Sequence, residues 1–194
     1  MPRGDFPPKD KLIMKDLLFR YSELPLAGFL AEAAQTKDRL IKCRICPVSA
    51  ELVLRLEGMP QSIDPEYRHV MDNFSYHHIR ARHSGKREIL RGQIPITDND
   101  FIRIPEIIAR YDSLVLSTNK IGNDVLLYRR MFDDGILYLA EEIRRGRKEL
   151  AICTLYKRKR KLTDANRPED DADSGFVPFL PAKIANNPEE TKII

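Results

Sequence analysis

The 194-residue chain is 42% hydrophobic and 32% charged, with a mean hydropathy of −0.42, a composition typical of a soluble globular domain with its own core. No apolar run approaches the roughly 20 residues of a membrane helix, and the first ten residues, MPRGDFPPKD, lack the apolar segment of a signal peptide. We therefore expect a cytoplasmic protein that does not enter a membrane.

Charge is distributed unevenly along the chain. The net charge is +4, but residues 162–194 contain three basic and seven acidic side chains, a net of −4, which leaves +8 on residues 1–161. A basic body favours a polyanionic partner, most simply nucleic acid, although a solvated surface excess produces a similar value. We expect three parts: an N-terminal helical appendage over residues 1–37, an α+β domain over 38–161, and an acidic, proline-containing tail over 162–194. An apolar island at 176–180 either packs on the domain or docks a partner.

The first predicted elements are two short helices, around residues 11–21 and 27–34, separated at Pro25. Alternating residues then predict a strand from Leu40 to Cys46, and Ser49 is placed to cap a short helix. Cys43 and Cys46 form a C-x-x-C pair without a second Cys or Cys/His pair at zinc-site spacing. We interpret both as buried structural thiols and expect no metal site there.

Residues 64–83 predict one longer helix. Asp64-Pro65 is typical of a cap followed by the first helical position, and Ser84-Gly85 is typical of an end. The predicted buried stripe consists of Tyr67, Val70, Phe74 and Ala81. His77 and His78 fall on or beside it, and one turn on, Ile79 and His83 form an i,i+4 pair, as do His78 and Arg82.

Residues 92–96 predict a short extended segment, followed by a helix that Thr97 caps with acidic residues in its first turn. Asp98 and Asp100 could in principle bind Mg²⁺, but the helix cap explains them more simply. Pro105 starts or kinks the next helical stretch. We expect no metal and no other cofactor.

Four β-rich runs then follow, at 113–117, 124–131, 135–143 and 149–156, separated by turn residues. The predicted fold is α+β, with N-terminal helices packed on a four-stranded antiparallel β-meander. Strict alternation places Tyr128 and Arg130 on one face with Leu126, and places Leu150, Ile152, Thr154 and Tyr156 together on one face. A sheet face with Arg, Tyr, Glu and Thr beside a histidine-bearing helix would make a plausible site.

The last strand runs into the basic sequence KRKRK at 157–161. Lys157, Arg158 and Lys159 are candidate phosphate-binding residues, and a solubilising strand end is an equally good interpretation.

The cluster HHIRARH at 77–83 is the strongest candidate for chemistry. Cleavage of RNA without a metal needs a base for the 2′-hydroxyl proton, an acid for the leaving oxygen and cations for the phosphate. Neighbouring arginines lower a histidine pKa and keep the imidazole available as a base. We expect His77 and Arg80 to contact substrate. The sequence contains no phosphate-binding glycine loop, G-x-S-x-G elbow or H-E-x-x-H helix.

Three segments in order carry a family resemblance: HIRARHS at 78–84, ITDNDF at 96–101 with Ile104-Pro105, and the strand ending CTLY at 153–156. They resemble the phage-associated nuclease domains grouped with barnase, EndoU-type endoribonucleases, colicin-type ribonuclease toxins and RelE toxins, over about residues 38–160. The resemblance implies the α+β fold and a toxin-like, metal-independent ribonuclease associated with phage or prophage.

The resemblance also implies site residues. The family's helix histidine falls on His78, with Arg82 and His83 ending the motif; the strand-borne polar residue falls on Thr154, and a middle-hairpin residue on Tyr128 or Arg130. Ser84 stands before Gly85 where the family often has Gly directly, and His77 is additional, so which histidine faces substrate stays open.

Two functions follow from these expectations. The first is an endoribonuclease cutting RNA, including tRNA as a candidate substrate. His78 acts as general base or acid, Arg82 and Arg130 stabilise phosphate charge, and Thr154 and Tyr128 orient the scissile group. The alternative is a non-catalytic nucleic-acid-binding or protein-binding module of a mobile element. Expected partners are RNA and either an immunity protein or a phage structural protein.

Overall fold

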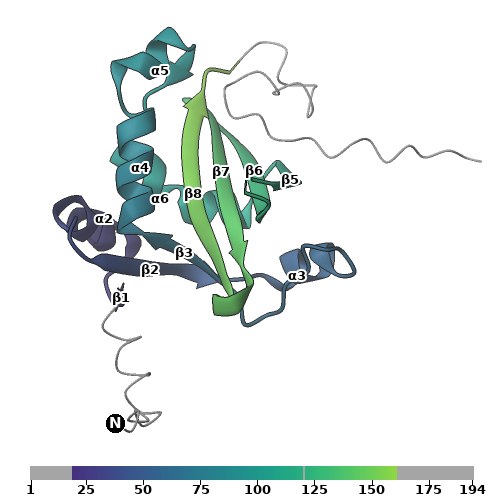
Figure 1. Cartoon of the computed structure of the whole chain (residues 1–194). Coiled ribbons are helices and arrows are strands. Elements are labelled where there is room, and N and C mark those ends of the chain that lie inside the picture. The colour runs from purple at the N-terminus through teal and green to yellow at the C-terminus, as the bar shows by residue number, and fades with distance from the viewer. Residues whose placement is uncertain (1–18, 120, 161–194) are drawn as a thin grey trace, which may run out of the picture.

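The computed structural model describes residues 19–119 and 121–160, which form a mixed eight-stranded sheet with helices around it (Figure 1). The strand order is β1-β2-β3-β8-β7-β6-β5, and β4 pairs with β8. In chain order the elements are β1 (Phe19–Ser22), α2 (Leu26–Gln35), β2 (Leu40–Pro47), α3 (Ala50–Leu56), β3 (Arg68–Asp72), α4 (Asn73–His83), α5 (Lys86–Leu90), β4 (Gln93–Ile94), α6 (Asp98–Ile102), α7 (Ile104–Ala109), β5 (Ser113–Thr118), β6 (Asp124–Phe132), β7 (Gly135–Arg144), the 3₁₀ turn η1 (Arg145–Arg147) and β8 (Glu149–Arg158).

The predicted fold class, N-terminal helices on a four-stranded antiparallel meander, was wrong. β5 to β8 do pair antiparallel in chain order, but the sheet continues through β3, β2 and β1. Two of the added pairings, β1 with β2 and β3 with β8, are parallel. The parallel pairing of β3 with β8 joins residues about 80 positions apart, such as Val70 and Ala151, and no local sequence pattern predicts such a contact.

The single helix predicted over residues 64–83 is a turn, a strand and a shorter helix. Asp64 accepts a hydrogen bond from the Glu66 amide in a turn, and β3 follows. Asp72 is the true cap, since it accepts from the Ser75 amide at 2.7 Å while the Ser75 hydroxyl lies 3.3 Å from the Asp72 amide. Because α4 begins at Asn73, the predicted stripe breaks: Phe74 is exposed, and the buried helix positions are Asn73, Tyr76 and Ile79.

Other local predictions agree with the structure. α2 contains the helix predicted at 27–34, and β2 contains the strand predicted at 40–46. Ser49 caps α3 by accepting from the Leu52 amide, and Thr97 and Asp100 form the capping box of α6. Of the helix predicted at 11–21, residues 11–18 lie outside the described residues and residues 19–22 are β1. The acidic tail predicted at 162–194 also lies outside them.

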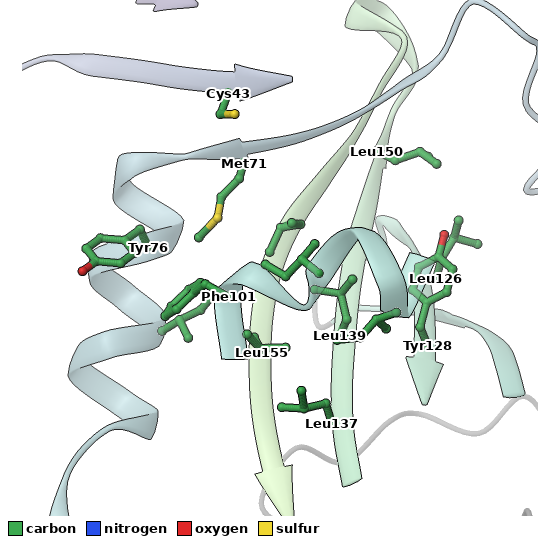
Figure 2. Close-up of a cluster of buried hydrophobic side chains, with 14 of the residues drawn as sticks. Cys43, Met71, Tyr76, Phe101, Leu126, Tyr128, Leu137, Leu139, Leu150 and Leu155 are labelled. Atoms are coloured by element: carbon green, nitrogen blue, oxygen red, sulfur yellow. The ribbon is translucent and has the colours of Figure 1, made fainter. Parts of the chain in front are cut away.

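The two faces of the sheet carry different side chains. One face packs against α6 and α7, and Figure 2 shows its buried apolar cluster, including Leu126, Leu137, Leu139, Leu150 and Leu155. We call the opposite face the outer face. In β7 and β8 it carries Ile136, Tyr138, Ala140, Glu142, Arg144, Glu149, Ala151, Thr154, Tyr156 and Arg158.

A β-bulge at Cys153 changes which residues of β8 share a face. Ala140 pairs with Thr154 and the next residue of β7, Glu141, pairs with Ile152, so β8 holds one additional residue. Leu150 and Ile152 belong to the core, whereas Tyr156 belongs to a second buried cluster. The predicted common face of Leu150, Ile152, Thr154 and Tyr156 was therefore wrong, because strict alternation does not hold across a bulge.

Candidate active site

His83, the last residue of α4, is held by a buried carboxylate. The Ser84 hydroxyl donates to the Arg80 carbonyl and ends the helix, and Gly85 leads into α5. There Glu88, only 1% exposed at its side chain, lies with Oε2 at 3.0 Å from His83 Nδ1. A carboxylate only accepts hydrogen bonds, so Nδ1 donates and the neutral imidazole keeps its lone pair on Nε2. The Glu88–His83 pair therefore fixes the tautomer and the orientation of the ring.

The Nε2 atom of His83 meets the outer face of the sheet. It lies 3.4 Å from the Thr154 hydroxyl oxygen, and the His83 ring is 6.0 Å from the Tyr156 ring, centroid to centroid. The bulge at Cys153 brings this about, because it turns Thr154 and Tyr156 to the outer face. Figure 1 shows α4 running alongside β8, which explains how a helix end and a strand residue meet.

Two tyrosines and an arginine continue the site along the outer face. Tyr138 and Tyr156 stack with 4.8 Å between centroids and 2° between planes, and the Arg158 guanidinium lies 5.6 Å and 5.8 Å from these rings. Both tyrosines are buried. This group places one predicted phosphate-binding residue, Arg158, on the same face as His83.

His78 and Arg82 lie on α4, close enough to one another and to His83 for their charges to interact. Arg80 contacts the Ile96 carbonyl and Asp98 on the α6 side of the helix, and each of the other two residues is about 200° of helical rotation from Arg80. They therefore occupy the side of α4 away from α6, and both are exposed. Partial burial, with Arg82 and His83 nearby, lowers the pKa of His78 below its usual value, which favours the neutral imidazole.

Two predicted substrate contacts have other partners. His77 Nε2 lies 3.1 Å from the Thr36 carbonyl after α2. Arg80 lies 3.5 Å from the Asp98 carboxylate, and its guanidinium also reaches a backbone carbonyl. Both side chains join elements of the fold, and neither is brought to His83 Nε2.

The structure does not bring Tyr128 and Arg130 to the outer face. Tyr128 is fully buried among the core side chains (Figure 2). Its burial, with the Glu141 carboxylate close by, holds the pKa of the phenol well above its usual value, so the hydroxyl stays protonated. Arg130 lies on the same face and pairs with Asp112 at 3.1 Å and Glu106 at 3.6 Å. Both residues face away from His83 and Thr154.

The basic run at the end of β8 divides between the two faces. Lys157 is buried on the core face, 2.8 Å from Asp100 and 2.6 Å from Asp134, so its charge is neutralised by these carboxylates inside the fold. Lys159 is exposed. Of the pair considered for Mg²⁺, Asp100 serves the Thr97 cap and Lys157, and residues 19–119 and 121–160 contain no cluster of His, Cys, Asp and Glu suited to a metal ion.

The thiols are not suited to nucleophilic chemistry. Burial raises the pKa of Cys43, raises that of Cys46 to about 11 together with Glu141, and raises that of Cys153 to about 12 with Glu142 and Glu141. All three are free cysteines that stay protonated at neutral pH.

Sequence reasoning missed Glu88. The available signal was an acidic residue five positions after His83, across a Ser-Gly turn, which a search for the carboxylate partner of each histidine would have found. Glu88 is also 3.4 Å from Arg91.

His83 is held by a buried carboxylate and lies against a hydroxyl on one face of a mixed sheet, an arrangement suited to acid–base chemistry that needs no thiol nucleophile. The model of one protein family, described as phage-Barnase-EndoU-ColicinE5/D-RelE like nuclease3, matches residues 53–165, and the chain belongs to this nuclease family. Comparisons with curated proteins and with solved structures give no significant match. Within the described residues, every helix is too short or too polar to span a membrane.

Proposed function

We propose that the protein is a metal-independent endoribonuclease of this nuclease family. The arrangement of Glu88, His83 and Thr154 carries the proposal, because it presents an oriented imidazole nitrogen beside a hydroxyl. RNA is the substrate that supplies what such a base needs, a 2′-hydroxyl next to the scissile phosphate. The net charge of +8 on residues 1–161 favours binding of the phosphate backbone.

In the proposed reaction, His83 Nε2 takes the proton of the 2′-hydroxyl. The 2′-oxygen then attacks the phosphorus, the bond from phosphorus to the 5′-oxygen breaks, and a 2′,3′-cyclic phosphate forms. The leaving 5′-oxygen takes a proton from the His78 imidazolium. The lowered pKa of His78 makes this imidazolium a stronger acid but reduces the protonated fraction at neutral pH. Arg82 stabilises the phosphate charge, and Thr154 orients the attacking group.

The test is incubation of the full-length protein with total RNA in EDTA, with mapping of fragment ends. We expect upstream fragments ending in 2′,3′-cyclic phosphate and downstream fragments beginning with a 5′-hydroxyl, and no cleavage of DNA of the same sequence. Loss of cleavage on addition of EDTA would overturn the metal-independent reaction. Salt-dependent RNA binding with no cleavage would instead support a non-catalytic binding module.

The family description associates the domain with phage, and we assign the protein a toxin-like role in which RNA cleavage harms the cell. Induced expression of the full chain is expected to arrest growth, and the His83→Ala variant is expected to relieve the arrest. Arrest by both proteins would remove nuclease activity as its cause.

A further inference from the structure

A second basic site lies at the other end of β8, away from His83. A cavity of about 400 Å³ opens where β1, β2, the start of β3 and the η1–β8 turn meet, and Arg44, Arg68, Arg147 and Lys148 line it. Tyr21, Glu66 and Glu149 complete its wall. We call it the basic pocket. None of its lining residues belongs to the acid–base site, and none was predicted from the sequence as a site residue.

The negative charges of the basic pocket already have partners. Glu149 accepts from Lys42 at 2.6 Å and 2.8 Å, both side chains being almost fully buried, and from the Tyr21 hydroxyl at 2.8 Å. Glu66 pairs with Lys148, which also lies 3.0 Å from Asp64. The lining therefore keeps an excess of positive charge.

Arg44 and Arg68 contribute to that excess. The Arg44 guanidinium lies over the Tyr21 ring at 4.0 Å from its centroid, and Arg68 Nη1 donates to the carbonyls of Pro65 and Tyr67, both at 2.8 Å. Within the described part of the chain, no carboxylate pairs with either guanidinium. Two positioned guanidinium groups that share a cavity suit the oxygens of a phosphate group.

The basic pocket opens on the same face of the sheet as the acid–base site. Glu149 alternates with the core residue Leu150, so it lies on the outer face with Thr154, and Arg68 is its register partner on β3. Arg44 is opposite Val70, which in turn is opposite Ala151. Along β8 the two sites are about 15 Å apart, at about 3.3 Å per residue. A single strand that lies across the outer face reaches both.

We propose that the basic pocket binds a backbone phosphate of the same RNA strand that the His83 site cleaves, a few nucleotides from the scissile bond. This inference rests on the proposed function. Two of the seven lining residues, Tyr21 and Arg44, lie outside residues 53–165, so the family match does not include this part of the pocket. The pocket thus makes RNA length a determinant of affinity.

The experiment compares the full-length wild type with Arg44→Gln, Arg68→Gln and the matched control Arg110→Ala, an exposed arginine at the end of α7. Two substrates are used: a dinucleotide, which spans only the scissile bond, and a long single-stranded RNA. We expect KM for the long RNA to rise about tenfold in each glutamine variant with kcat unchanged. Kinetics with the dinucleotide should stay at the wild-type level, and Arg110→Ala should leave both substrates unaffected.

A binding measurement separates this inference from the proposed function. The Kd for a long oligonucleotide with 2′-O-methyl groups, which cannot be cleaved, is measured at several salt concentrations. Each lost phosphate contact should reduce the slope of log K against log salt concentration by about 0.7. Unchanged Kd and KM in both glutamine variants, with RNA still cleaved, would overturn the pocket alone. Binding that depends on Arg44 without any cleavage would support the pocket and overturn the nuclease activity.

Two further controls complete the design. Titration with inorganic phosphate and a nucleoside monophosphate tests whether the pocket binds a small ligand instead of RNA. If either ligand requires Arg44 for binding while the affinity for RNA does not depend on Arg44, the RNA assignment is overturned. Circular dichroism and thermal unfolding verify folding, and Arg44→Lys keeps the charge if a glutamine variant unfolds. Arg44→Lys should restore part of the affinity for long RNA, because a lysine supplies charge without the planar fork.

Discussion

His83 and Thr154 are 71 residues apart in the chain, yet His83 Nε2 lies 3.4 Å from the Thr154 hydroxyl oxygen. One comes from the end of a helix and the other from a strand just past a bulge, and Glu88 holds the imidazole from its other side. This relationship distinguishes His83 from the two histidines earlier in the same helix.

Replacement of His83 by Ala should reduce kcat/KM for RNA by about 10² to 10⁴, because it removes the proposed base. His78→Ala should cost less, since solvent water can protonate the leaving oxygen in its place. Initial rates in EDTA with a labelled RNA measure both. His77→Ala, which removes the contact with the Thr36 carbonyl, serves as the matched control. Wild-type rates in both His83→Ala and His78→Ala would refute the assignment of the site.

Glu88→Gln should lower kcat by about 10- to 100-fold with little change in KM, because the amide no longer enforces the tautomer with its lone pair on Nε2. Glu88 is a positioning residue, so the decisive readout is the ring itself. Nitrogen chemical shifts of His83 should show one tautomer in the wild type and a mixture in the variant. An unchanged tautomer together with reduced kcat would point to a structural defect.

Arg82→Ala should raise the pKa of His78 toward 6.5, because it removes a positive charge that disfavours the imidazolium. The rise should be incomplete, since burial is the larger cause of the lowered pKa. Titration of the histidine ring protons by NMR measures the shift, with Arg87→Ala as a control that removes an exposed charge on α5. A His78 pKa that stays the same in Arg82→Ala would contradict the placement of the two residues on one side of α4.

The same shift predicts how His78 affects stability. Its pKa is lower in the folded than in the unfolded protein, so the unfolded state binds more protons and stability falls as pH decreases below 6.5 toward the folded pKa. The His78→Gln variant should therefore gain stability relative to the wild type at pH 5 and show no such gain at pH 8. Urea unfolding at the two pH values measures the difference, and an equal effect at both would contradict the prediction.

Lys42→Met should destabilise the fold by about 3 to 5 kcal/mol, because it leaves the buried Glu149 carboxylate without its cation. The double variant Lys42→Met with Glu149→Gln should recover part of the loss. Urea unfolding of the single and double variants gives the coupling free energy between Lys42 and Glu149. Arg20→Ala, which breaks an exposed ion pair with Glu32, should cost less than about 1 kcal/mol. A similarly small loss in Lys42→Met would show that the carboxylate finds other partners.

The sequence by itself determined the features that depend on neighbouring residues. The strands β5 to β8, the caps at Ser49 and Thr97, and the end of the histidine helix at Ser84 all follow from alternation, turn residues and side chains that bond to nearby backbone. The motifs at 78–84, 96–101 and 153–156 were also sufficient to indicate the nuclease family that the comparison confirmed.

Only the tertiary structure decided which side chains meet. β3 was predicted as helix because Asp64-Pro65 is a good local helix start, but pairing with β2 and β8 overrides it. The bulge at Cys153 turns Thr154 outward while Tyr128 and Arg130 stay on the core side. Lys157 is buried on that side and pairs with Asp100 and Asp134. A shift of one residue in a strand exchanges its faces, and contacts between distant segments set that shift, so no local pattern could fix the site.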